Sequence, residues 1–203
     1  MTDDTQLKPT DNNILFLDIS SSCTGFAIGK MDYRKKEAVI LQAGVIWFGN
    51  DWDHGRKYNY LLNYVLNDAY VNGQIFDIVA EAYMVNKKRM MGTLVIPEAT
   101  GAVKAACYEA DPPIGFQHIY PQSWRSLLGI KKNTKFAGTK AWKEPAKEFV
   151  DKKFPGVVPA QLTSNITKKP RPTPYDLYDV ICIACAYFKK YEIDKVDFKA
   201  VIK

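Results

Sequence analysis

The segment from Val180 to Phe188 limits most strongly what this chain can fold into. It reads VICIACAYF, has no charged residue on any side, and lies within a predicted helix at about 174–190. A helix that is apolar all round is buried, so the domain must enclose it. Asp176 and Asp179 stand one turn apart at its start, on neighbouring positions of one surface. The chain therefore places two carboxylates at the mouth of a buried helix.

The rest of the chain alternates strand-like and helix-like segments. Strands are predicted at 13–19, 25–30, 38–48, 75–82 and 115–120, and helices at 55–70, 95–110, 121–129 and 139–152. The first three strands look antiparallel, and the later ones alternate with helices as in βαβ units. This order predicts an α/β fold with one mixed, five-stranded sheet flanked by helices.

At 203 residues the chain is long enough for about one domain. We expect a disordered lead at 1–12, a single domain at 13–192 and a C-terminal tail at 193–203. The sequence has no apolar run of about 18 residues, and its first residues lack the apolar core of a signal peptide. A cytoplasmic protein with reduced cysteines and no membrane contact is therefore expected.

Acids also interrupt two segments that are predicted to be buried strands. Asp18 follows the apolar run LFL, and Glu81 lies near the end of IFDIVAEA. Ligand sites in open α/β sheets lie at the carboxyl ends of strands, so parallel neighbouring strands would bring both acids together. Asp18 could instead cap the Ser-rich turn that follows it, and Asp176 could cap its own helix behind an N-cap at Thr173. Asp179 has no such structural role.

The acids together predict a metal site. Buried carboxylates are normally paired or metal-bound, and no Lys or Arg lies between Arg171 and Lys189 to neutralise the two acids of the last helix. Like charges this close raise one another's pKa unless a cation intervenes. Oxygen-only ligands favour hard ions such as Mg²⁺ or Mn²⁺. The predicted catalytic residues and metal ligands are Asp18, Glu81, Asp176 and Asp179.

Positive charge is clustered along the chain, whose formal net charge is +6 at pH 7. Basic residues gather at 86–89, 131–140 and 168–171, and aromatic residues lie nearby. A single basic run is usually a solvated loop. Three of them in one modest domain favour a phosphate-rich partner such as a nucleic acid.

These motifs and their order resemble the RuvC-type Holliday junction resolvases of the ribonuclease-H-like nuclease superfamily, especially the phage-type members. The resemblance covers residues 13–190 and rests on Asp18 followed by Thr24-Gly25, on Glu81 ending the fourth strand, and on Asp176-x-x-Asp179-x-x-x-x-Ala184. Two departures are visible. Bacterial members usually read Asp-Pro-Gly where this chain has Asp18-Ile19-Ser20, and many have His in place of Asp176.

The resemblance implies a ribonuclease-H-like fold and a homodimer that cuts two strands of a four-way DNA junction symmetrically. It implies two Mg²⁺ ions per subunit, for which Mn²⁺ can substitute, with Asp18 bridging them. Glu81 and Asp179 would complete one coordination shell and Asp176 would help the other. The products would be nicks with a 5′-phosphate and a 3′-hydroxyl. A phage-encoded member would act in the cytoplasm of its bacterial host.

The resemblance also places an aromatic or apolar wedge near the crossover, where Tyr83 and Met84 follow Glu81; core or subunit-contact roles for these two residues are equally open. The small-residue helix near 95–110 would pack across the dimer. Basic side chains would rim the site and clamp a second DNA arm. The expected DNA-binding set is Tyr83, Met84, Lys87, Lys88, Arg89, Lys131, Lys132, Lys135 and Lys140.

Three other functions are open on the sequence. Sugar kinases and actin-like ATPases share the opening pattern, with LDISSSCTG as an ATP phosphate loop, but they need two such domains and a second Asp-Gly-rich loop that is not found here. A DNA-binding module without catalysis would not need four acids. The third function is cleavage of forks, flaps or other branched DNA by the same nuclease site. The loops at 130–138 and 155–170 leave open which branched DNA is the substrate.

Overall fold

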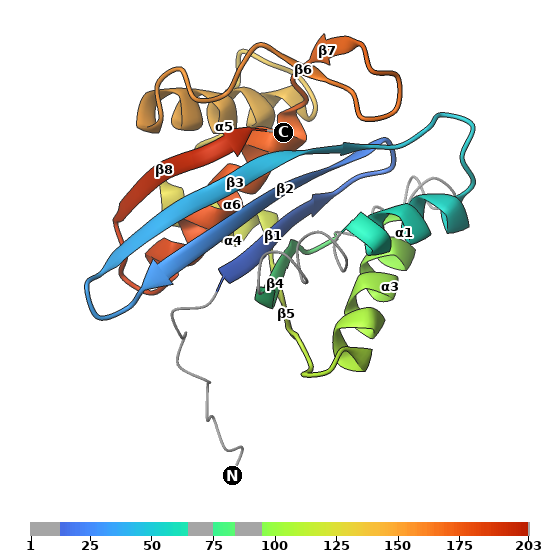
Figure 1. Ribbon diagram of the computed structural model, residues 1–203. Coiled ribbons are helices and arrows are strands. Elements are labelled where there is room, and N and C mark those ends of the chain that lie inside the picture. The colour runs from blue at the N-terminus through green and yellow to red at the C-terminus, as the bar shows by residue number, and fades with distance from the viewer. Residues whose placement is uncertain (1–12, 65–74, 84–94, 203) are drawn as a thin grey trace.

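The fold was obtained as a computed structural model, which describes residues 13–64, 75–83 and 95–202 (Figure 1). The predicted lead at 1–12 lies outside these residues. The strands are β1 (Asn13–Ile19), β2 (Cys23–Asp32), β3 (Glu37–Trp47), β4 (Ile75–Glu81), β5 (Gly115–Ile119), β6 (Gln161–Thr163), β7 (Pro170–Pro172) and β8 (Lys195–Ile202). The helices are α1 (His54–Asn63), α3 (Val95–Glu109), α4 (Pro121–Leu128), α5 (Lys140–Lys153) and α6 (Tyr175–Lys190).

The main sheet has the strand order β5-β4-β1-β2-β3-β8. The first three strands pair antiparallel, while β4 lies parallel to β1 and β5 lies parallel to β4. This confirms the predicted mixed sheet. The strands carrying Asp18 and Glu81 are parallel neighbours, which is the condition under which the two acids come together.

The sheet has six strands rather than the predicted five. Residues 195–202, expected as part of a tail, form β8 and pair parallel to β3. Val196 and Phe198 alternate along this strand and pack on the core beside α5, because successive strand residues point to opposite faces. Lysines on the intervening positions suit an edge strand, and they make the segment look like a polar tail in the sequence.

Helices cover both faces of the sheet (Figure 1). Along β1, Ile14 and Phe16 belong to the hydrophobic core beneath α4, α5 and α6, whereas Leu15 and Leu17 belong to the core beneath α1 and α3. The apolar residues of β1 are therefore buried whichever way they point, which explains why its sequence shows no polar alternation.

Helix α6 lies in the middle of the larger core, as its uncharged sequence predicts. Every residue from Leu177 to Phe188 is buried. The predicted N-cap at Thr173 is wrong by one residue, since the helix begins at Tyr175 behind Pro174 and no side chain caps it. The Thr173 hydroxyl instead donates to the carbonyl of Pro159 in the preceding loop. The Asp176 carboxylate contacts Cys23 and Lys143.

The loop at 155–173 is folded around the small β6–β7 sheet and is attached to β3. The side chain of Asn165 accepts a hydrogen bond from the Trp47 amide and donates to the Trp47 carbonyl and the Tyr60 hydroxyl. These bonds attach the loop to the end of β3, beyond the last pairing of β3 with β8. Within the described ranges, no helix combines the length and the apolar character needed to cross a bilayer.

Candidate active site

All four predicted acids line one cleft of about 290 Å³. Asp18 is the next-to-last residue of β1, and Glu81 ends the adjacent parallel strand β4. Both acids lie an even number of residues from side chains of the α6-side core, Phe16 and Val79, so both face α6. Asp176 and Asp179 meet them from the start of α6. The site thus stands at the carboxyl ends of parallel strands, where sequence reasoning placed it.

The carboxylates are buried and repel one another. Asp18 is 6% exposed and Asp179 is 5% exposed. Burial, reinforced by Glu81 and the two acids of α6, raises the pKa of Asp18 well above its usual range. Burial also raises the pKa of Asp179 to about 7, although the nearby Lys143 opposes the shift.

Glu81, the acid at the end of β4, is affected by burial in the same way. Burial raises the pKa of Glu81, while a hydrogen bond from Trp124 and the charge of Arg125 oppose this. The Oδ1 atom of Asp179 is buried and has no hydrogen-bond partner in the described part of the chain. The cleft therefore holds more negative charge than its surroundings neutralise.

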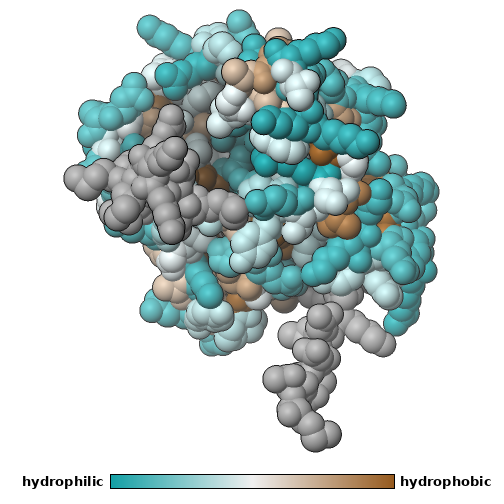
Figure 2. Space-filling view, turned by 180° about the vertical axis from the view of Figure 1, so that it is seen from behind, coloured by the Kyte–Doolittle hydropathy of each residue, from teal (hydrophilic) through white to brown (hydrophobic). Residues whose placement is uncertain are grey.

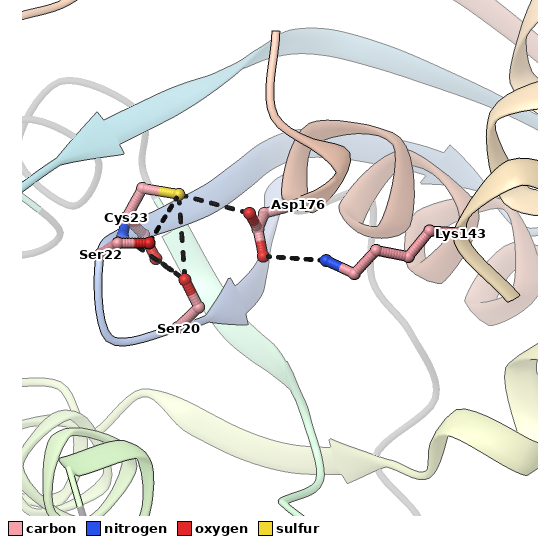
Figure 3. A network of polar contacts seen from close by, with 5 residues as sticks. All are labelled: Ser20, Ser22, Cys23, Lys143 and Asp176. Atoms are coloured by element: carbon pink, nitrogen blue, oxygen red, sulfur yellow. Dashed lines mark hydrogen bonds and ion pairs between the residues drawn. The ribbon is translucent and has the colours of Figure 1, made fainter. Parts of the chain in front are cut away.

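Two cations that sequence reasoning missed also line the cleft, Arg125 from α4 and Lys143 from α5. The Lys143 ammonium lies 3.9 Å from Asp176 Oδ1 (Figure 3). Burial alone would lower the pKa of Lys143, but the charges of the surrounding acids raise it above its ordinary value. The acids of α6 are thus partly neutralised from another helix, which a search along their own segment could not find.

Neighbouring side chains hold two of the acids in place. Trp124 Nε1 donates to Glu81 Oε1 over 2.7 Å. Cys23 Sγ donates to Asp176 Oδ2 over 3.3 Å (Figure 3). Burial and the charge of Asp176 raise the pKa of the Cys23 thiol to about 12, so it stays protonated as a donor. The Ser-rich turn is closed by Ser20, whose hydroxyl donates to the Cys23 carbonyl over 2.7 Å.

Gly25 in β2 allows α6 to approach the sheet. A Cβ atom on this residue would lie 2.2 Å from the backbone oxygen of Asp176. Only a residue without a side chain fits so close to another backbone segment. The Thr24-Gly25 motif therefore positions the first turn of α6, and with it the two acids that α6 contributes.

The four acids suit a hard divalent cation by their chemistry. Their donor atoms are all carboxylate oxygens, one buried oxygen of Asp179 has no partner in the described ranges, and a bound cation would lower the raised pKa values. As the side chains stand, no group of three or more Asp, Glu, His or Cys residues in the described ranges is positioned to hold a metal ion. A cation shared by three or more of these acids would need side-chain positions other than these.

The predicted DNA-binding residues fall into three places. Tyr83 lines the acidic cleft. Lys131, Lys132 and Lys135 are exposed and line a separate depression of about 500 Å³ beside α5. Lys140 is exposed at the start of α5, with its ammonium 3.8 Å from Glu144 Oε1. The predicted residues outside the described ranges are Met84, Lys87, Lys88 and Arg89.

No protein-family model matches this chain, and no curated protein matches its sequence. Its structure, however, is similar to solved structures of Holliday junction resolvases. It aligns with T. thermophilus RuvC in complex with Holliday junction substrate at a TM-score of 0.61 and 15% identity, covering 90% of this chain and 97% of that one. The yeast mitochondrial Holliday junction resolvase Ydc2 aligns at a TM-score of 0.59 and 14% identity, covering 90% of this chain and 80% of that one.

The fowlpox virus Holliday junction resolvase is also similar, at a TM-score of 0.55 and 9% identity, over 88% of this chain and 99% of that chain. At such low identity the similarity concerns the arrangement of the backbone. It agrees with the arrangement of strands and helices described above. This chain has the ribonuclease-H-like fold of the RuvC-type Holliday junction resolvases.

Proposed function

We propose that this chain is a structure-selective endonuclease that resolves four-way DNA junctions. The observation that carries the proposal is the convergence of four acids, from two strands and one helix, on a single cleft. The fold shared with three junction resolvases supports it. In this proposal a phage-type homodimer nicks two strands symmetrically in the cytoplasm of its host, leaving 5′-phosphate and 3′-hydroxyl ends.

The acids would hold two Mg²⁺ ions, with Mn²⁺ as a substitute. Asp18 would contribute to both positions, Glu81 and Asp179 to one of them and Asp176 to the other. Bound ions of this kind activate a water for attack and stabilise the departing oxygen. Burial raises the pKa of Asp179, and one of its oxygens has no hydrogen-bond partner among the described residues, so a bound cation would stabilise its charged form.

The other residues of the cleft would position the acids and the DNA strand. Trp124 holds Glu81 through its indole N–H. Lys143 offsets the acids of α6 and presents its charge to the phosphate that enters the cleft. Tyr83, which lines the cleft, would stack on a base opened at the crossover.

A cleavage assay tests this function. Purified protein is given a four-way junction, a fork and a linear duplex, in Mg²⁺, in Mn²⁺ and in EDTA. We expect paired, symmetric nicks on the junction alone, and none in EDTA. Asp179→Asn should slow cleavage more than about 100-fold, since even the indirect partners of a metal ligand account for 10–100-fold.

Asp151→Asn is the matched control, because Asp151 is a surface acid paired with Lys147 on α5. Its cleavage rate should equal that of the unmodified protein. Undiminished cleavage by Asp179→Asn would refute the proposed site. If forks were cut as fast as junctions, the proposed nuclease activity would stand, but its substrate would be branched DNA in general.

A further inference from the structure

A second groove lies beside the acidic cleft, between α4 and α5. Its volume is about 420 Å³, and Trp142 and Ile130 form its apolar walls. Lys131 and Lys132 stand on its rim and are exposed. The face that carries α4, α5 and α6 is mainly hydrophilic, and hydrophobic residues show only in small patches and hollows (Figure 2). An apolar groove with a cationic rim is therefore a distinct feature of this face.

Arg125 connects the groove to the acidic cleft, because its side chain lines both. Its guanidinium lies between two tryptophans, 4.7 Å from the Trp124 ring and 5.1 Å from the Trp142 ring. Its Nε is buried and has no hydrogen-bond partner in the described ranges. Stacking and the charges of Glu81 and Asp179 thus hold a cation at the boundary between the two hollows.

The rim lysines also separate the groove from the depression of about 500 Å³ beside α5. Lys131 and Lys132 line both hollows and form a ridge between them. The depression is also lined by the basic side chains of Lys135 and Lys152. One side of this ridge is therefore mainly apolar and aromatic, while the other combines apolar side chains with four lysines. A nucleotide has the same two parts, a flat apolar base and an anionic phosphate.

We propose that the groove between α4 and α5 binds an unpaired nucleobase of the strand whose phosphate enters the acidic cleft. The base stacks on Trp142, and the lysines of the ridge hold its flanking phosphates. Stacking on an aromatic ring tolerates any base, which suits an enzyme that recognises shape. The volume matches that of small-ligand pockets, and the basic rim selects a polyanion. This inference rests on the proposed junction-cleaving function.

The test is an abasic scan of junction binding in EDTA, so that no strand is cut. Four-way junctions carry a single abasic nucleotide at successive positions around the cleavage site, and dissociation constants are measured by fluorescence anisotropy. With the unmodified protein, one position should weaken binding about tenfold. Trp142→Ala should weaken binding of the intact junction by the same factor. It should cause no further loss on that one abasic junction, and Trp142→Phe should behave like the unmodified protein.

Trp52→Ala is the matched control. Trp52 is also a partly buried tryptophan under an arginine, with Arg56 at 4.5 Å from its ring, and it lines neither the cleft nor the groove. It should bind every junction as the unmodified protein does. Because Trp142→Ala could disturb folding, a second measurement uses the unmodified protein. A junction with 5-iodouracil at the sensitive position should crosslink to Trp142 on irradiation, as mapped by mass spectrometry.

Equal binding of the intact junction by Trp142→Ala and the unmodified protein would overturn the proposal. So would a loss that is the same on every abasic junction, or a crosslink that maps elsewhere. A groove that serves an aromatic, acidic peptide would give these same negative results. The proposed function has a separate readout, since symmetric cleavage of the intact junction does not require that the groove holds a base.

Discussion

At the scale of single residues, Asp179 shows most clearly how the acidic cleft lowers the stability of the fold and why a cation would restore it. Its side chain is almost fully buried, one of its oxygens has no hydrogen-bond partner among the described residues, and burial raises its pKa to about 7. A buried carboxylate is costly to ionise unless a counter-charge stabilises it. Without a cation, the charged form of this residue therefore destabilises the fold at neutral pH.

Asp179→Asn should accordingly make the metal-free protein more stable at neutral pH. Folding raises the pKa of Asp179, so the folded state binds the proton more tightly than the unfolded state. The resulting stability is fully present below about pH 4 and is lost as the pH rises toward 7. The variant avoids this loss and should gain on the order of 2–4 kcal/mol at pH 8. Urea unfolding in EDTA at pH 5 and pH 8 measures this difference in the free energy of unfolding between the variant and the unmodified protein.

Asp151→Asn controls for the removal of a carboxylate from the surface, and its stability should change with pH as that of the unmodified protein does. A pH dependence that is the same in Asp179→Asn and in the unmodified protein would show that Asp179 titrates normally.

At the scale of elements, the site depends on how closely α6 lies against β2. Gly25 makes this approach possible, because any side chain there would meet the backbone of Asp176. The helix is held on its other sides by α4 and α5, which supply Trp124, Arg125 and Lys143 to the cleft. Displacing the start of α6 would therefore move two acids together while leaving those of β1 and β4 in place.

Gly25→Ala should weaken the fold and slow cleavage more than the loss of stability explains. Overpacking of this kind costs about 1–3 kcal/mol. A displacement of about 1 Å in a catalytic group can slow a reaction about 100-fold. Urea unfolding and the junction-cleavage rate of the folded variant measure the two effects.

Gly55→Ala serves as the reference substitution. Gly55 is exposed in the first turn of α1, and a Cβ atom there would meet only the Asp53 carboxylate at 3.5 Å, an ordinary contact. This variant should match the unmodified protein in stability and rate. If Gly25→Ala does the same, α6 has room to move and the close approach is unimportant.

At the scale of the whole molecule, the four acids of the cleft and the exposed lysines of the loop at 131–135 line different, neighbouring hollows. The acidic cleft, the apolar groove and the basic depression follow one another, linked first by Arg125 and then by the lysines of the ridge. DNA bound along this series would place its phosphates against the lysines while one phosphate enters the cleft. Binding should then depend on salt through counterions released by those lysines.

Replacing Lys131 and Lys132 together by Gln should reduce that dependence. Each lost phosphate contact lowers the slope of log Kd against log salt concentration by about 0.9, so the double variant should lose about 1–2. Anisotropy titrations of a four-way junction in EDTA at several salt concentrations measure the slope.

The matched pair is Lys189 and Lys190, two adjacent exposed lysines at the end of α6 opposite Asp176. Replacing them by Gln should leave the slope unchanged. An equal fall in both variants would mean that only overall charge matters, and the ridge would lose its assigned role.

The sequence by itself determined the mixed sheet, the buried last helix and the four acids that line one cleft. These follow from local signals, because an acid inside an apolar run such as the one before Asp18 conflicts visibly with its surroundings. Where the local signal was weak, prediction was inaccurate. The lysine-rich β8 looked like a tail, and the helix start at Tyr175 was placed one residue early.

Only the tertiary structure decided which groups surround the acids. Trp124, Arg125 and Lys143 lie on other helices, and Cys23 lies 153 residues before Asp176. Nothing in their own segments marks them, since a tryptophan or lysine on an amphipathic helix is ordinary. Their roles arise from the packing of α4, α5 and β2 around α6, and the apolar groove exists only where α4 and α5 meet. An acid within an apolar segment can be recognised from the sequence, whereas the side chains that neutralise it come from segments that only folding brings together.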